Sequence, residues 1–244
     1  MLYTTSNGLL DTRACPIAMS SIPNLIRPES LAQQGYHTIR RAIRDGKIAR
    51  GQFFSESTLA QSLGVSRTPV REALLNLYRD GVVEIVPKRG YRLAELDDAA
   101  ISELRLLRVA LEQLVVARLC EVVTPAEIHE LRVIVKDKGR SQVDMYAIDE
   151  AFHIRMAELA GFQQIRRELL SVRGKMYLMA SGTNVAALRN DKVVQEHNLL
   201  IDALERHDAK TAKRVITEHV ERSINAFEAA RTQLVEKLQL ERIS

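Results

Sequence analysis

Residues 55–92 constrain the fold of this chain more than any other stretch, because two short helical patterns and a hairpin pattern follow one another there directly. The first helical pattern covers residues 57–63 and ends at a turn that begins with Gly64. Ser66 is placed to cap the second helix, since a serine hydroxyl there can accept a hydrogen bond from a free backbone N–H. Pro69 falls in the first turn, where its missing N–H costs little. This order predicts a helix–turn–helix unit.

The second helix has one apolar face, and its first turn carries polar and basic side chains away from that face. The apolar positions recur at helical spacing and are Val70, Ala73, Leu74 and Leu77. Thr68 and Arg71 lie off this stripe, and Arg67 stands at the helix start. Because the N-terminal residues of a recognition helix read base edges in the major groove, this placement indicates DNA binding.

A basic hairpin follows the second helix. Two apolar runs at about 82–86 and 91–94 are joined by Pro87, Lys88, Arg89 and Gly90, which is turn chemistry with two cations at the tip. Such a hairpin suits the phosphates beside a bound helix. The alternative is an ordinary helical protein in which the arginine-rich face is merely exposed to water.

The strings LAxxLGVSRTPVREAL and DGxVxxxPxRGYRL resemble the winged-helix domain of the GntR family of bacterial transcription regulators, over about residues 30–94. The resemblance implies that the start of the second helix approaches bases and phosphates and that the wing enters the adjacent minor groove. The residues to which it assigns DNA contacts are Arg67, Thr68, Pro69, Arg71, Arg89 and Gly90. The family often has a basic residue where this chain has Ser57, so one phosphate contact is missing from the pattern.

Charge and composition agree with a nucleic-acid-binding module on a larger chain. Residues 31–94 carry eleven Lys and Arg against five Asp and Glu, whereas the remainder after residue 94 is mildly acidic. Cys15 and Cys120 form no CxxC motif, and no apolar run approaches the ~18 residues of a membrane span. We therefore expect a cytoplasmic protein without membrane segments, with residues 1–29 as a flexible extension and Met19 as an alternative start.

Residues 97–236 are helical in period throughout, and no strand pattern recurs. Thr124 and Glu127 form a capping box with Pro125 between them. The expected helices cover about 98–121, 125–139, 142–160, 163–180, 191–206 and 208–236, after a first helix of the DNA module at 31–46. The sequence thus predicts a mainly α protein, with a winged helix-turn-helix domain at 30–94 and an antiparallel bundle of about six helices at 97–236.

Four potential metal ligands lie on three of the bundle helices. Asp149 and His153 are four residues apart and so share one helix face. His197 and His219 stand among apolar neighbours on two later helices, which indicates that both face the interior. Three imidazoles and a carboxylate suit Zn²⁺, Ni²⁺ or Mn²⁺. The alternative is a set of hydrogen-bonded core histidines and an ordinary Asp–His pair.

The motifs RVALE at 108–112, DEAFH at 149–153 and QEH at 195–197, with the late His219, are similar to the FCD ligand-binding domain of the FadR subfamily. The number of helices suggests its shorter VanR-like branch. This resemblance implies one divalent transition metal per chain, bound by Asp149, His153, His197 and His219. It also implies that Arg108 binds the carboxylate of an effector, since a guanidinium can hold a carboxylate through two parallel hydrogen bonds. Arg173 is a second candidate, and the alternatives for Arg108 are exposure or a pair with Glu112.

These features predict a homodimeric, ligand-responsive regulator that binds a palindromic operator in double-stranded DNA and a small carboxylate effector. Two other interpretations remain open at this stage. The Asp–His₃ set could activate water in a hydrolase-like metalloenzyme, although Glu196 and Glu218, each one residue before a ligand histidine, point away from the ion and leave no general base. Alternatively, the metal could be purely structural, and the regulator would then respond to protein partners.

Overall fold

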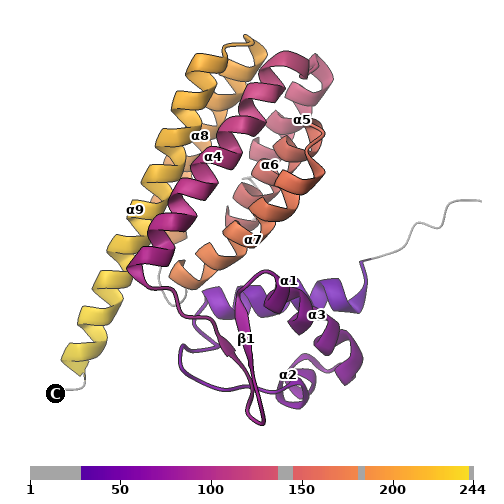
Figure 1. Cartoon of the computed structure of the whole chain (residues 1–244), viewed down its shortest axis with the longest axis vertical. Coiled ribbons are helices and arrows are strands. Elements are labelled where there is room, and N and C mark those ends of the chain that lie inside the picture. The colour runs from indigo at the N-terminus through magenta and orange to yellow at the C-terminus, as the bar shows by residue number, and fades with distance from the viewer. Residues whose placement is uncertain (1–28, 137–144, 181–184, 242–244) are drawn as a thin grey trace, which may run out of the picture. The chain divides into compact units, whose positions relative to one another are not determined.

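The computed structural model describes residues 29–136, 145–180 and 185–241 (Figure 1). The expected N-terminal extension, with Cys15 and Met19, lies outside these residues up to residue 28. The described part is mainly helical with one small sheet, as the sequence predicts. None of its helices is long and apolar enough to cross a membrane.

The first module contains three helices and a two-stranded antiparallel sheet. Its elements are α1 (Leu31–Arg44), α2 (Glu56–Leu63), α3 (Arg67–Arg79), β1 (Val83–Val86) and β2 (Gly90–Leu93). Val83 pairs with Leu93 and Val86 with Gly90, so the strands form the wing that the sequence predicts. The predicted apolar stripe of α3 is fully buried and packs with Ile39 and Ile43 of α1. This core fixes the orientation of α3.

The cap of α3 differs from the prediction. Ser66 occupies the N-cap position, but its side chain makes no capping hydrogen bond. A capping hydroxyl normally accepts from the backbone N–H of the second or third helical residue, and the third residue here is Pro69, which has none. The preceding helix has the regular arrangement, in which the Ser55 hydroxyl accepts from the N–H of Thr58 at 3.1 Å.

The wing is attached to the segment before α2 by a close backbone approach. Phe54 and Tyr91 exchange two backbone hydrogen bonds of 2.9 Å. Gly90 has a φ of 98°, and a Cβ there would lie 2.5 Å from the carbonyl oxygen of Phe54. Only glycine combines this backbone conformation with this contact.

The second module is a bundle of six helices, the number that the sequence predicts. They are α4 (Asp98–Val122), α5 (Pro125–Lys136), α6 (Met145–Leu159), α7 (Gln163–Ala180), α8 (Val185–Glu205) and α9 (Ala209–Glu241). The prediction placed the start of α8 six residues too late, because only the later part has a clear apolar period. It also ended α9 five residues early, and the predicted ends near residues 139 and 142 lie outside the described residues.

Local signals define the ends of several bundle helices. Asp97 caps α4 by accepting from the N–H of Ala100 at 2.7 Å. The predicted capping box is present before α5, since Thr124 N–H donates to Glu127 at 2.8 Å and Glu127 N–H donates to the Thr124 hydroxyl at 3.4 Å. Long helix α4 packs beside α9, and α9 in turn packs on α8 (Figure 1). This packing brings side chains from distant parts of the sequence into one interior.

Candidate metal centre and nucleic-acid interface

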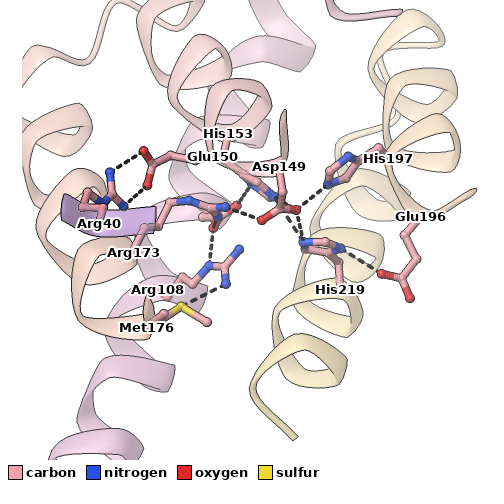
Figure 2. Close-up of polar contacts among 11 residues, drawn as sticks. Arg40, Arg108, Asp149, Glu150, His153, Arg173, Met176, Glu196, His197 and His219 are labelled. Carbon is pink, nitrogen blue, oxygen red and sulfur yellow. Dashed lines mark hydrogen bonds and ion pairs between the residues drawn. The ribbon is translucent and has the colours of Figure 1, made fainter. Parts of the chain in front are cut away.

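The four predicted metal ligands meet inside the bundle. Asp149 and His153 come from α6, His197 from α8 and His219 from α9. One ligand atom of each lies within 4.8 Å of those of the other three, and all three histidines are buried (Figure 2). The helical spacing of Asp149 and His153 therefore indicated the correct face, and the apolar neighbours of the other two correctly indicated burial.

Four of the six separations between the donor atoms lie close to those around one metal ion. Nε2 of His153 lies 3.1 Å from Nε2 of His219, and Nε2 of His197 lies 3.1 Å from Oδ1 of Asp149. The same Asp149 oxygen is 3.5 Å from Nε2 of His153 and of His219. Adjacent ligands bound at about 2.1 Å to one ion stand roughly 3.0–3.4 Å apart. The donor set and its spacing fit a divalent transition metal.

Burial keeps the imidazoles in the form that binds metals. It lowers the pKa of His219 to about 3, and it also lowers the pKa of His197. Burial alone would raise the pKa of Asp149, but the nearby charge of Arg173 holds that pKa well below its usual value. Metal ligation requires neutral imidazole and ionised carboxylate, and the shifts of His197, His219 and Asp149 all favour these forms.

Two buried carboxylates contact the far sides of two of these imidazoles. Oε2 of Glu196 accepts from Nδ1 of His219 at 2.8 Å, and Oε2 of Glu112 contacts Nδ1 of His153. Neither carboxylate belongs to the set of site residues that the sequence predicts. From the sequence, Glu196 is expected to point away from the ion, whereas its side chain is buried and bonded to the far nitrogen of the ligand candidate His219. Only the motifs RVALE and QEH, which contain these residues, pointed to them.

Arg108 and Arg173 lie beside the same cluster (Figure 2). Arg108 is 1% exposed and donates through Nε to Oε1 of Glu112 at 2.7 Å, so the alternative of an exposed arginine is wrong and the pair with Glu112 is present. Arg173 donates to Oδ2 of Asp149. Nη2 of Arg108 and Nε of Arg173 are buried and make no hydrogen bond within the described residues. Two guanidinium groups therefore keep donors unused next to the histidines.

Asp149 is followed by a residue that faces a different helix. Glu150 accepts from both Nη atoms of Arg40, which belongs to α1, at 2.7 and 2.5 Å (Figure 2). Arg40 is 3% exposed and also stacks over the Tyr36 ring. This bidentate ion pair joins α6 to the first module one residue away from a metal-ligand candidate.

The residues predicted to contact DNA lie at the surface of the first module. Arg67, Thr68 and Arg71 are exposed at the start of α3, and Pro69 is half-buried beside them. Arg71 binds Glu56 of α2 at 2.9 Å, a pairing that the sequence did not reveal.

At the wing, Arg89 is exposed and its guanidinium lies 5.0 Å from the centre of the Phe53 ring. Gly90 allows the tight approach described above. The assigned side chains of α3 and the wing are thus accessible to a partner, while their contacts with bases and phosphates stay a prediction.

Comparison with known proteins agrees with this architecture. Residues 31–93 match the model of the bacterial regulatory proteins of the gntR family, and residues 103–222 match the FCD domain. A Streptomyces ambofaciens HTH-type transcriptional regulator in an unstable DNA locus is 29% identical over 80% of this chain and 84% of its own length. An HTH-type transcriptional regulator in the TAR-I ttuE-ttuC' intergenic region of Agrobacterium vitis is 35% identical over 48% of this chain and 74% of its own length.

Among solved structures, Escherichia coli McbR/YncC superposes with a TM-score of 0.66 at 20% identity, covering 83% of this chain and 99% of that one. At this identity the likeness shows a shared fold. The matched families and relatives are transcriptional regulators, which decides against the hydrolase interpretation. The chain is therefore a DNA-binding transcriptional regulator that belongs to the GntR family and carries an FCD domain of the FadR type.

Proposed function

We propose that this regulator is a cytoplasmic homodimer that binds a palindromic operator and responds to a small carboxylate through a metal centre in its helical bundle. Asp149, His153, His197 and His219 hold one Zn²⁺, Ni²⁺ or Mn²⁺ ion per chain in this proposal. The observation that carries it is the convergence of four donor atoms within 4.8 Å, three of them on buried imidazoles. Contacts within the cluster join these groups in pairs, whereas one shared ion accounts for the approach of all four donors at once.

The arginines beside the cluster support an anionic effector. A bound divalent ion offers a Lewis-acidic position to a carboxylate oxygen. Arg108 adds a buried guanidinium whose Nη2 makes no hydrogen bond within the described residues, and Arg173 adds an unused Nε. A buried donor without a partner costs about 1–3 kcal/mol, so a ligand that accepts from it recovers that energy. A small organic acid satisfies both requirements, whereas a neutral apolar ligand satisfies neither.

A response requires the effector to favour one of two states of the protein, since coupling is a free-energy difference between states. The ion pair between Arg40 and Glu150 supports a route for this coupling, because Glu150 adjoins Asp149 on α6 while Arg40 belongs to α1 of the DNA-binding module. If ligand binding shifts α6, it moves the Glu150 carboxylate that Arg40 binds, and α1 must adjust to keep the ion pair. In a dimer, this changes the relative placement of the two recognition helices.

The test combines metal analysis with DNA binding. Protein purified without chelator is examined by elemental analysis, and its affinity for DNA selected from a random pool is then measured with and without di- and hydroxy-acids. We expect about one divalent ion per chain and at least one acid that changes DNA affinity. Metal-free protein of undiminished stability would contradict the metal site, and a full panel of acids without effect on either melting or DNA affinity would contradict the effector.

A purely structural metal is the second candidate, and it is favoured by the depth at which the histidines lie. It predicts that chelation unfolds the bundle without changing DNA affinity when equal folded fractions are compared. The proposed function predicts that metal removal abolishes the response to the acid in protein that remains folded.

A further inference from the structure

We propose that Glu112 is a positioning residue that fixes His153 in the tautomer protonated at Nδ1 and thereby prepares its Nε2 for a metal ion. This inference rests on the proposed metal site. Glu112 is not itself a metal ligand. Glu196 has the corresponding position behind His219, where we expect a change to an amide to have a smaller effect.

Each oxygen of Glu112 has a close nitrogen neighbour, although only Oε1 makes a hydrogen bond of regular geometry within the described residues. Oε1 accepts from Nε of Arg108 at 2.7 Å, and Oε2 contacts Nδ1 of His153. The side chain is 2% exposed, and Arg173 lies 3.7 Å from the same oxygen that Arg108 binds. Two guanidinium groups this close favour the ionised carboxylate, which can only accept hydrogen bonds. Oε2 is the acceptor nearest to Nδ1 of His153, and neither atom has another hydrogen-bond partner within the described residues, so the contact favours a proton on Nδ1.

This assignment leaves the lone pair of neutral His153 on Nε2, the nitrogen that lies 3.1 Å from Nε2 of His219. The same argument holds for His219, because Glu196 accepts from its Nδ1 at 2.8 Å. With both protons on Nδ1, neither Nε2 can donate to the other across this distance, and a cation bound by both nitrogens takes the place of that hydrogen bond. Carboxylates behind ligating histidines orient them and raise their basicity.

The two carboxylates differ in what a change to an amide would do. Glutamine at 112 has one carbonyl and one NH₂, and it faces donors on both sides. If the carbonyl keeps Arg108, the NH₂ donates to Nδ1 of His153 and drives the imidazole proton to Nε2, where it blocks the metal. If the carbonyl turns to His153, the NH₂ is pressed against the Arg108 donor in a buried site. Either arrangement loses a buried interaction.

A glutamine at 196 is not held between two buried donors in this way. Its second oxygen accepts from Nη1 of Arg222 at 3.1 Å, and the Arg222 side chain is 52% exposed. Arg222 also binds Glu218 at 2.8 Å and can turn towards water. The amide carbonyl can therefore stay on His219 while the NH₂ takes the position of the oxygen beside Arg222, whose half-exposed side chain can move aside. Glu196→Gln is thus a matched control that removes the same charge beside a neighbouring ligand.

A merely structural Glu112, present only to neutralise two buried arginines, would change stability but not the tautomer of a histidine. The experiment therefore measures both quantities on the full chain. Metal-free wild type, Glu112→Gln and Glu196→Gln are labelled with ¹⁵N-histidine, and the tautomer of each ring is read from its nitrogen shifts and couplings. The His153 signals are those missing from His153→Gln. Affinity for Zn²⁺ is measured by competition with a chromophoric chelator.

We expect His153 to be protonated at Nδ1 in the wild type and in Glu196→Gln. Glu112→Gln should bind Zn²⁺ about 10–100-fold more weakly, the range for loss of a carboxylate behind a ligating histidine, while Glu196→Gln changes affinity only a few-fold. Protonation of wild-type His153 at Nε2, or equal affinities of the two variants, overturns the proposal. If the wild type binds no metal, the proposed function fails while the tautomer measurement still decides the role of Glu112. If Glu112→Gln does not fold, the wild-type tautomer alone decides.

Discussion

Arg40 donates hydrogen bonds to Glu150 from both terminal nitrogens of its guanidinium, at 2.7 and 2.5 Å. Glu150 directly follows Asp149 on α6. Asp149 faces the histidines while its neighbour faces α1, so one turn of helix contacts both the candidate metal centre and the DNA-binding module. Bidentate pairs are directional as well as strong. A displacement of α6 cannot leave this contact unchanged.

Glu150→Gln should reduce the change in operator affinity that the effector produces. The amide keeps the size of the side chain but can accept from only one Arg40 nitrogen. Allosteric effects commonly amount to 5–150-fold in affinity, and we expect the effect of the acid on DNA affinity to fall to a small part of its wild-type value. Fluorescence anisotropy with labelled operator measures this. Glu158→Gln is the control, because Glu158 lies on the same helix and pairs with Arg155 and Arg166 of the bundle. An undiminished response in Glu150→Gln would refute this route.

Arg71→Ala should reduce discrimination between operator and random DNA by ~1–3 kcal/mol, the usual value of one good base contact. The structure adds a second expectation. Glu56 binds Arg71 in the free protein, so Glu56→Gln should release the guanidinium and tighten DNA binding. Gel-shift titrations compare both variants with Arg79→Ala, at the opposite end of α3. Unchanged specificity in Arg71→Ala would remove the start of α3 from base recognition.

His197→Ala and His219→Ala should lower metal content and thermal stability together, because the ion binds only the folded arrangement of ligands. At a free metal concentration 100 times the dissociation constant, the ion stabilises the fold by about 2.7 kcal/mol, and this contribution should vanish. Elemental analysis and melting curves provide the measurements. His129→Ala is the control, since His129 is exposed on α5 and outside the cluster. Normal metal content in both variants would show that the two residues are core histidines.

Arg108→Ala should abolish most of the thermal shift that di- and hydroxy-acids produce, while metal content persists. Its own melting temperature should also fall, because Glu112 loses the partner at 2.7 Å. Arg108→Lys separates the two effects, since lysine keeps the charge but lacks the planar fork that binds a carboxylate twice. We expect the lysine variant to recover stability but little of the ligand shift. A full ligand shift in both variants would place the acid elsewhere.

Gly90→Ala should destabilise the wing and weaken DNA binding. A residue with a side chain loses roughly 1–2 kcal/mol in the left-handed region, and here its Cβ would also meet the Phe54 carbonyl oxygen at 2.5 Å. Gly51→Ala isolates the conformational part, because Gly51 has a φ of 74° and open space around it. Denaturant titration should therefore show a larger loss for Gly90→Ala than for Gly51→Ala. Equal losses would mean that the wing moves aside without penalty.

Periodic apolar positions made much of the fold predictable from the sequence. The stripe from Val70 to Leu77 and the capping box at Thr124 depend on neighbours within one or two helical turns, and both are present in the structure. The pair Asp149 and His153 was predictable for the same reason. The first turns of α8 were not predicted, because the apolar positions become clearly periodic only in the later part of this helix.

The contacts around the site were harder to predict, because they join residues far apart in the chain. Glu112 is 41 positions from His153, and Glu196 is 23 positions from His219. Nothing in the local pattern of α4 or α8 distinguishes these carboxylates from ordinary surface acids. The pairing of Arg71 with Glu56 likewise depends on the angle between α2 and α3, which sequence periodicity does not specify.

The helix start at Ser66 and Pro69 has a consequence for how the protein meets DNA. The Ser66 hydroxyl makes no capping hydrogen bond, and Pro69 has no N–H, so Arg67 and Thr68 carry the first backbone donors of α3. A helix N-terminus attracts anions through such donors and its partial positive charge. We therefore expect a phosphate of the operator to accept hydrogen bonds from the exposed start of α3 in the place that a capping hydroxyl would occupy.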